Sequence, residues 1–163
     1  MAYRVCFVCT GNICRSPMAE SVFRARLAEA GLDGRVTADS AGTGGWHEGE
    51  TADPRAASVL REHGYDTGHV ARQFQVSWFA RLDLVIALDT GHLRALRRLA
   101  PTEQDARKIR LLRSYDPAAG DDLDVPDPYY GAQDGFEECL EMVEAASTGL
   151  LAAVRERLEG RAA

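Results

Sequence analysis

The stretch from Val5 to Met18 reads VCFVCTGNICRSPM, and the rest of the chain is organised around it. Residues 5–8 form an apolar run typical of a buried strand, and Ser16-Pro17 carries the signal of a helix start. Gly11 and Asn12 lie between the two and tolerate the left-handed backbone of a tightly curled loop. The sequence therefore predicts a strand, a loop and a helix N-terminus in direct succession.

Such a loop can bind a tetrahedral oxyanion such as phosphate, because its main-chain N–H groups can converge on one point. A thiol at a helix N-terminus beside an arginine is held as the thiolate, so Cys9 is predicted to be a nucleophile. The planar guanidinium of Arg15 can hold two phosphate oxygens. Ser16 is placed to donate its hydroxyl to the sulfur, and Pro17 suits the first helical position.

The alternative is that Cys9 is only a small buried side chain at the end of a strand. A cysteine and an arginine at this spacing would not by themselves exclude that interpretation. The glycine, asparagine, serine and proline that follow Cys9 between the predicted strand and the predicted helix favour a functional role for this cysteine. The loop also differs from the nucleotide-binding loop of ATPases and GTPases. It lacks the Gly-Lys-Ser/Thr ending, and its predicted nucleophile lies within the anion-binding loop itself.

The segment CTGNICRSP, residues 9–17, resembles the signature of the low-molecular-weight protein tyrosine phosphatases. Chain length and the order of motifs agree with that family from end to end. The resemblance implies that Cys9 and Arg15 are catalytic. It also implies that the substrate phosphate is bound by the remaining loop residues Thr10, Gly11, Asn12, Ile13, Cys14 and Ser16.

Three later stretches match the same family. In SAGTGGW, residues 40–46, the resemblance places Trp46 at the edge of the pocket, where we expect it to stack on the substrate ring. In HVARQ, residues 69–73, it makes His69 a support of the phosphate loop, with Ser40 and Asn12 as hydrogen-bond partners. In DPYY, residues 127–130, it supplies a catalytic acid and two aromatic residues, Tyr129 and Tyr130, that wall the pocket.

The acid falls in a loop, residues 116–130, in which prolines and a glycine interrupt regular structure. This hydrolysis needs a carboxylic acid that first protonates the leaving phenolate and then activates water. The prolines on either side of Asp127 restrict its backbone, and the family motif favours it. Asp124 is the fallback for the same role.

Alternating strand and helix patterns predict an α/β doubly wound fold with a four-stranded parallel sheet, strand order 2-1-3-4, and helices on both faces. The expected strands span residues 3–9, 36–41, 83–88 and 109–112. The expected helices span residues 17–30, 54–63, 90–99 and 135–158, with a short one at 76–81. Right-handed crossovers would gather the Cys9 loop, Trp46, Asp89 and the Asp127 loop at the carboxyl edge of the sheet.

Length and composition set the remaining expectations. A chain of 163 residues, 45% of them hydrophobic and 27% charged, fits one domain over residues 1–163. No apolar stretch is long enough for a membrane span and no signal peptide precedes the first strand, so we expect a cytoplasmic location without membrane attachment. A net charge of −6 disfavours nucleic acid as a partner. Four cysteines without paired spacing support neither zinc nor a disulfide framework, and no cofactor is expected.

The resemblance implies hydrolysis of phosphotyrosine-containing proteins through S-phosphocysteine, without a metal. An arginine phosphatase on the same scaffold is the nearest alternative, but Ile13 stands where its signature has threonine. Arsenate reductase needs further cysteines, and a phosphotyrosine-binding module does not need Asp127. A protective Cys9–Cys14 disulfide and phosphorylation of Tyr129 or Tyr130 remain open hypotheses.

Overall fold

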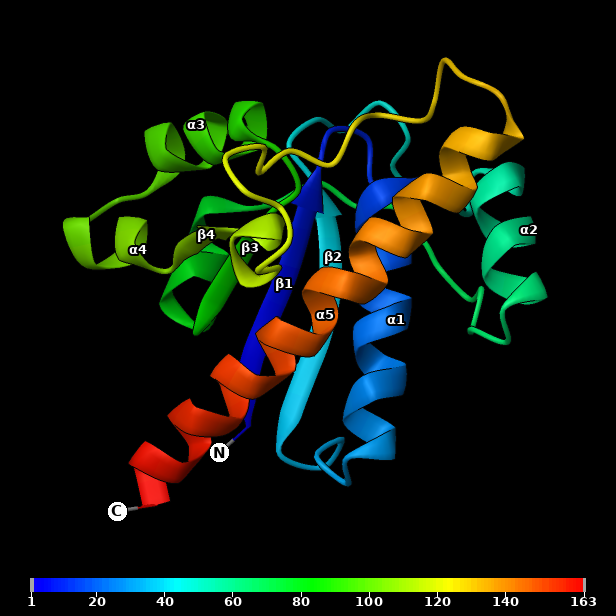
Figure 1. The fold of residues 1–163 in the computed structure, drawn as a ribbon. Coiled ribbons are helices and arrows are strands. Elements are labelled where there is room, and N and C mark those ends of the chain that lie inside the picture. The colour runs from blue at the N-terminus through cyan, green and yellow to red at the C-terminus, as the bar shows by residue number, and fades with distance from the viewer. Residues whose placement is uncertain (1, 163) are drawn as a thin grey trace.

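A computed structural model describes residues 2–162 and has a four-stranded parallel sheet in the order β2-β1-β3-β4. The strands are β1 (Tyr3–Cys9), β2 (Val36–Gly42), β3 (Leu84–Ala87) and β4 (Ile109–Leu111). Figure 1 shows β1 at the centre of the sheet, running from the N-terminus toward the loops that crowd one edge. The predicted fold class and strand order are confirmed.

The helices lie around this sheet and alternate with its strands. They are α1 (Arg15–Glu29), α2 (Pro54–Glu62), α3 (Thr90–Leu99), α4 (Glu103–Arg107) and α5 (Gln133–Ala162), with 3₁₀ turns η1 (Val76–Ala80) and η2 (Leu112–Tyr115). In Figure 1, α1 and α5 cover one face with α2 beside them, whereas α3 and α4 lie toward the other. Within residues 2–162 no helix is both long enough and apolar enough to cross a bilayer.

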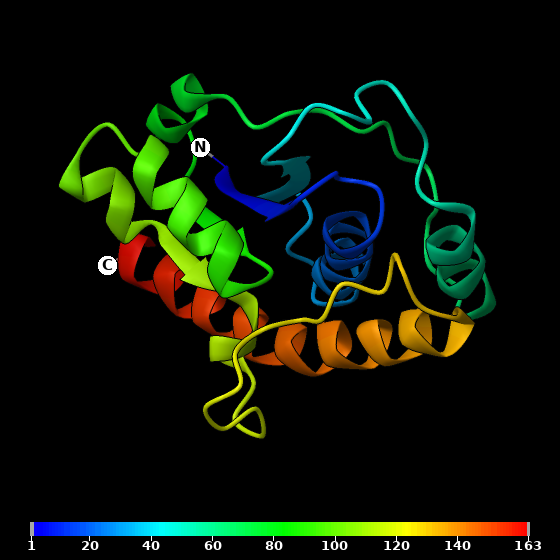
Figure 2. The same ribbon diagram turned by 90° about the horizontal axis from the view of Figure 1, so that it is seen from above.

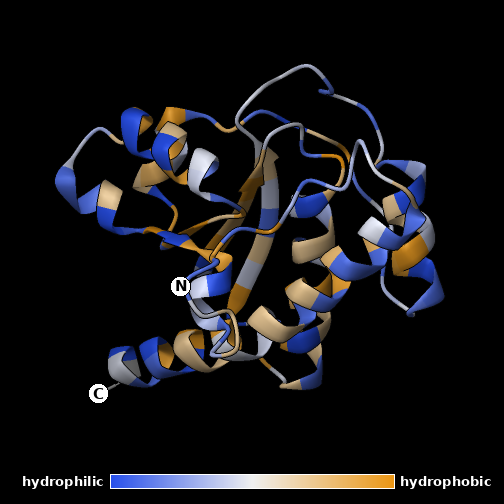
Figure 3. Ribbon diagram, turned by 45° about the horizontal axis from the view of Figure 1, so that its top comes forward, coloured by the Kyte–Doolittle hydropathy of each residue, from blue (hydrophilic) through white to orange (hydrophobic). Residues whose placement is uncertain are grey.

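The central strand is buried on both faces, which explains its continuous apolar run. Val5 and Phe7 join the cluster under α1 and α5, whereas Cys6 and Val8 join the cluster under η1 and α3. Figure 3 shows the strands of the sheet as predominantly hydrophobic ribbon between helices with many hydrophilic positions. β1 is therefore fixed by packing from two sides, and the loop at its end starts from a rigid position.

The carboxyl ends of the strands meet at one edge. Cys9 is paired with Gly42 of β2, and Val8 is paired with Ala87 of β3. Seen from above in Figure 2, the loops after β1 and β2 and the long loop before α5 lie over this edge. Residues 10–14, 43–50 and 116–132 are thereby brought together although they are far apart in the sequence.

Two helix starts differ from their predicted positions. α1 begins at Arg15, so Pro17 occupies the third helical position, where its missing N–H is still one of the unpaired groups of the first turn. α5 begins at Gln133, two residues before its predicted start at residue 135. In the first turns of α5, Glu137 lies 3.0 Å from Nε2 of His63 at the end of α2, so the two helices are in contact there.

The turn η2 and the helix α4 were not predicted, because neither is long enough to show a periodic apolar pattern. The side chain of Thr102 caps α4 by accepting the N–H of Asp105 at 3.1 Å. η2 packs on α5 at Gly149, where an added Cβ would lie 1.9 Å from the carbonyl oxygen of Tyr115. Only glycine allows this close approach between the helix and the turn.

Replacing Gly149 by alanine should lower the free energy of unfolding by ~1–3 kcal/mol, because the added methyl overlaps main-chain atoms that cannot move aside. Gly160→Ala is the matched control, since a Cβ there meets nothing within 4 Å, and it should keep or slightly raise stability. Urea unfolding followed by circular dichroism measures both. Equal stability of the two variants would contradict the packing described for α5 and η2.

Candidate active site

The loop after β1 directs its carbonyl groups into the surrounding protein. The carbonyl oxygens of Cys9, Thr10 and Ile13 accept hydrogen bonds at 2.8, 3.0 and 2.8 Å from N–H groups of residues 43, 44 and 53. Within residues 2–162, no hydrogen bond is donated by the main-chain N–H groups of residues 11–14. These donors are therefore available to an anion above Cys9, as the loop motif predicts.

Asn12 holds the loop in this shape. It is fully buried and has a φ of 59°, in the left-handed region. Its side-chain amide donates to Ser16 Oγ at 2.8 Å and Ser40 Oγ at 3.0 Å, and its Oδ1 accepts the N–H of Arg72 at 2.9 Å. His69 Nε2 donates to the carbonyl oxygen of Asn12 at 2.6 Å. Every polar group of the side chain is satisfied in this one conformation, which offsets the cost of the unusual backbone.

The sulfur of Cys9 lies 2.9 Å from Ser16 Oγ, and only 3% of Cys9 is exposed. Ser16 Oγ already accepts a hydrogen bond from Asn12, so its own proton is free to be donated. The other acceptor near it, the carbonyl oxygen of Ala41, is farther away at 3.4 Å. The hydroxyl is thus placed to donate to a thiolate, the arrangement that the sequence predicts for these two residues.

Arg15 is held almost completely buried beside the loop, with 3% of the residue exposed. Its Nη1 donates to Asp89 Oδ2 at 2.8 Å and to the carbonyl oxygen of Val125 at 2.9 Å. Its Nη2 lies 3.6 Å from Asp127 Oδ2. One nitrogen therefore anchors the guanidinium, and the other faces the segment that carries the proposed acid.

The charge of Arg15 is secured by its neighbours. Burial alone would lower the pKa of Arg15, but the nearby Cys9, Asp89 and Asp127 outweigh burial and raise the pKa above its usual value. Burial would likewise raise the pKa of Asp89, yet the N–H of His92 and the guanidinium of Arg15 lower it. The pair is therefore ionised at neutral pH, and the guanidinium keeps its charge for an anion.

His92 belongs to the site although the sequence analysis did not single it out. Only 4% of it is exposed, and its Nε2 lies 2.8 Å from Thr10 Oγ1 and 3.5 Å from Arg15 Nη2. Burial, helped by the positive charge of Arg15, lowers the pKa of His92 to about 4. The imidazole is therefore neutral at pH 7. Because Arg15 can only donate, Nε2 is the accepting nitrogen, and it orients the hydroxyl of Thr10.

The two candidate acids occupy different places. Asp127 lies at the cavity above Cys9, its Oδ1 accepting the N–H of Tyr129 at 3.0 Å and its side chain 40% exposed. Asp124 instead accepts the N–H of Thr90 at 2.8 Å, at the first turn of α3, and does not line this cavity. The geometry therefore favours Asp127 over the fallback.

A cavity of about 320 Å³ opens above the loop and brings most of the predicted site residues together. It is lined by Cys9, Thr10, Gly11, Ile13, Cys14, Arg15, Trp46, His47, Asp127, Tyr129 and Tyr130. Trp46 and Tyr130 stand at its rim with 74% and 90% of their surfaces exposed. Four of the predicted site residues do not line the cavity. They hold the loop in shape through hydrogen bonds instead, and they are Asn12, Ser16, Ser40 and His69. His47 is a further lining residue that the sequence analysis did not select.

All four cysteines are free thiols and buried. Burial, followed by the nearby charges of Asp53 and Cys9, raises the pKa of Cys14 well above its usual value. Burial raises the pKa of Cys139 to about 12. Cys14 lines the same cavity as Cys9, so the protective disulfide between them stays a prediction.

Comparisons with known proteins agree over nearly the whole chain. Residues 4–160 match the family described as low molecular weight phosphotyrosine protein phosphatase. A low molecular weight protein-tyrosine-phosphatase of Streptomyces coelicolor is 80% identical over 164 residues, covering 100% of both chains. Low molecular weight protein-tyrosine phosphatase A of Mycobacterium tuberculosis is 52% identical, covering 94% of this chain and 93% of that one. A protein tyrosine phosphatase of Entamoeba histolytica, crystallised with Hepes in its active site, has a TM-score of 0.91 at 34% identity, covering 95% of this chain and 98% of that chain.

The neutral buried state of His92 makes stability depend on pH. The unfolded chain protonates His92 near its ordinary pKa of 6.5, whereas the folded chain does so only near pH 4. Between these values the unfolded state binds more protons, so the free energy of unfolding should fall as pH drops from 6.5 to 4, by up to ~3 kcal/mol. In His92→Gln this part of the pH dependence should be absent.

Urea unfolding at a series of pH values measures this effect. His63→Gln is the comparison, because it removes an exposed histidine that lies outside the site and contacts Glu137. Parallel pH profiles for the parent and His92→Gln would show that His92 is not held neutral by the fold.

Proposed function

Because the chain belongs to the low molecular weight phosphotyrosine protein phosphatase family, we propose that this protein tyrosine phosphatase works through a phosphorylated Cys9, with Asp127 as acid and then base. One observation carries the mechanism. The thiol of Cys9, the guanidinium of Arg15 and the carboxyl group of Asp127 line one cavity of about 320 Å³. The proposed nucleophile, the anion-binding guanidinium and the proton donor thus line one cavity, which is large enough for a phosphorylated aromatic side chain.

In the first step, the Cys9 thiolate attacks phosphorus, the S–P bond forms and the P–O bond to the tyrosine breaks. The main-chain N–H groups of residues 11–14 and Nη2 of Arg15 bind the three non-bridging oxygens. These donors are fixed before the substrate arrives, so little free energy is spent on reorienting them in the transition state. Asp127 gives its proton to the leaving phenolate.

In the second step, a water molecule attacks the phosphocysteine and Asp127, now a carboxylate, takes a proton from that water. The S–P bond breaks and phosphate leaves. Ser16 Oγ, 2.9 Å from the sulfur, donates its hydrogen bond to the departing thiolate. The same hydroxyl therefore favours the thiolate as nucleophile and as leaving group.

Aromatic side chains at the rim support phosphotyrosine as the substrate. Tyr129 and Tyr130 pack edge to face with ring centroids 5.0 Å apart, and the guanidinium of Arg55 lies 5.5 Å from the Tyr129 ring. With Trp46 they form walls against which a phenyl ring can stack. Because Cys9 is 3% exposed at the base of the cavity, a phosphoserine side chain, which has no ring, would reach the sulfur less readily. We propose proteins with exposed phosphotyrosine as the partners.

The alternatives fit less well. An arsenate reductase would pass a disulfide to further cysteines, but Cys139, on the core-facing side of α5, is only 2% exposed. A module that only binds phosphotyrosine would have no use for a carboxyl group beside the leaving oxygen. Ile13 offers an apolar lining rather than the threonine hydroxyl of the arginine phosphatase signature.

A thiolate nucleophile is lost when it is oxidised, so we propose a reducing compartment, the cytoplasm, as the place of action and signalling as the role.

Asp127→Ala should lower kcat/KM for aryl phosphates by roughly 10²–10⁴, the usual effect of losing a general acid. The loss should grow with the pKa of the leaving phenol, because a poor leaving group depends most on the proton. Initial rates with a series of substituted phenyl phosphates measure this. Asp124→Ala is the control, and it should keep the parental dependence on the leaving group although it loses the contact with Thr90. A large, leaving-group-dependent loss in Asp124→Ala instead would move the acid to Asp124.

A further inference from the structure

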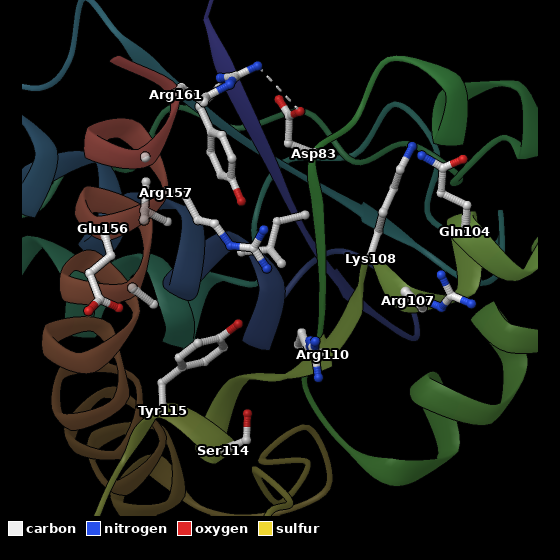
Figure 4. A pocket seen from close by; sticks show the side chains of 15 residues that line it. Asp83, Gln104, Arg107, Lys108, Arg110, Ser114, Tyr115, Glu156, Arg157 and Arg161 are labelled. Carbon is white, nitrogen blue, oxygen red and sulfur yellow. Dashed lines mark ion pairs between the residues drawn. The ribbon is translucent and has the colours of Figure 1, made fainter. Parts of the chain in front are cut away.

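A second cavity, of about 890 Å³, lies at the opposite edge of the sheet from Cys9. It is bordered by the first residue of β1, the starts of β3 and β4, α4, η2 and the last turns of α5. Figure 4 shows the side chains that line it, which come from segments far apart in the sequence. Tyr3 belongs to this cavity and Cys9 to the catalytic one, so the two cavities lie at opposite ends of the same central strand.

The lining of this second cavity is basic although the chain has a net charge of −6. Among residues 2–162, the acidic side chains that border it are only Asp83 and Glu156. The basic side chains that line it are Arg107, Lys108, Arg110, Arg157 and Arg161. Positive charge is thus concentrated at one hollow of an otherwise acidic protein, which attracts anions to that place.

Internal ion pairs use only part of this positive charge. Arg161 lies 3.8 Å from Asp83, and Lys108 lies 3.1 Å from Asp105. For Arg107, Arg110 and Arg157, no ion pair or hydrogen bond from the side chain is found within residues 2–162. Three guanidinium groups therefore stand around one hollow with their donors available to a ligand.

Two tyrosines add neutral donors to the same hollow. Figure 4 shows Arg157 and Arg110 on the side of the cavity to which the hydroxyl of Tyr115 points. Tyr3 lines the same cavity, and the charge of Arg157 acts on its hydroxyl. Tyr3 is 7% exposed, and burial raises the pKa of both tyrosines, so both stay protonated. No hydrogen bond of either hydroxyl is found within the described part of the chain. Each hydroxyl can therefore donate a hydrogen bond to an anion bound in the cavity.

We propose that this cavity binds a small molecule that carries two or more phosphate groups. Planar guanidinium groups match phosphate oxygens in pairs, and three of them can neutralise more charge than one phosphate carries. The cavity volume lies within the usual range for small-molecule sites, roughly 300–1,000 Å³. The acidic remainder of the chain disfavours a nucleic acid, which would extend beyond the basic hollow. Because this cavity and the catalytic one share no lining residue, both can be occupied at once.

The test is a titration of the full-length protein with pyrophosphate, followed by the main-chain amide signals in two-dimensional NMR. Saturating vanadate blocks the catalytic cavity throughout. We expect saturable shifts at residues 110–115 and 153–161, and weaker binding of orthophosphate at the same residues. Arg110→Ala/Arg157→Ala should raise the dissociation constant at least tenfold.

Arg97→Ala/Arg98→Ala is the matched control, since it removes two exposed arginines from α3 and should bind pyrophosphate as the parent does. Hydrolysis of a phosphotyrosine peptide should be unchanged in both double variants, which reports on the catalytic site separately. The proposal is overturned if no saturable shift appears at millimolar pyrophosphate, if shifts are confined to residues 9–16, or if the two double variants bind equally well. Equal affinity for orthophosphate and pyrophosphate would also overturn it, by showing an adventitious ion only.

Discussion

The structure depends on one constraint, the left-handed conformation of the buried Asn12 at the turn of the loop. Asn12 forms hydrogen bonds with Ser16, Ser40, Arg72 and His69. These hydrogen bonds would be lost if the loop changed to a different backbone conformation. The cost of leaving such groups unpaired in the interior exceeds the cost of the backbone strain. The loop is therefore held open around an anion site before any anion is bound, and its N–H groups need no partner from the protein.

Arg15 connects this loop to a segment more than a hundred residues later in the chain. Its Nη1 donates to the carbonyl oxygen of Val125, whose own N–H donates to Leu88 at the end of β3. Asp124, which first seemed an alternative acid, helps to hold the same segment through Thr90. Two residues beyond Val125 the chain reaches Asp127, at the mouth of the cavity. The guanidinium proposed to bind the substrate thus also helps to position the carboxyl group proposed as the catalytic acid.

The sequence alone was sufficient for the sheet, its strand order and the main helices, because the apolar runs are long and the helical stripes repeat regularly. Short elements such as α4 and η2 carry no such repeat and were missed. His92 was missed because its importance comes from contacts with Thr10 and Arg15, which lie about eighty residues earlier. The basic cavity could not be foreseen either, because its arginines come from separate segments and each one alone is typical of a solvated surface. Local patterns therefore predicted the elements, whereas the contacts between distant segments required coordinates.

The proposed mechanism requires the sulfur of Cys9 to carry the phosphoryl group during turnover. This intermediate can be trapped by rapid acid quenching of the enzyme while it hydrolyses a phosphotyrosine peptide, and located by peptide mapping in a mass spectrometer. We expect one phosphoryl group on the peptide that contains residues 9–15, attached to Cys9 and formed as fast as tyrosine is released. Release of tyrosine with no phosphorylated Cys9 at any time, or phosphorylation of a different residue at that rate, would contradict it.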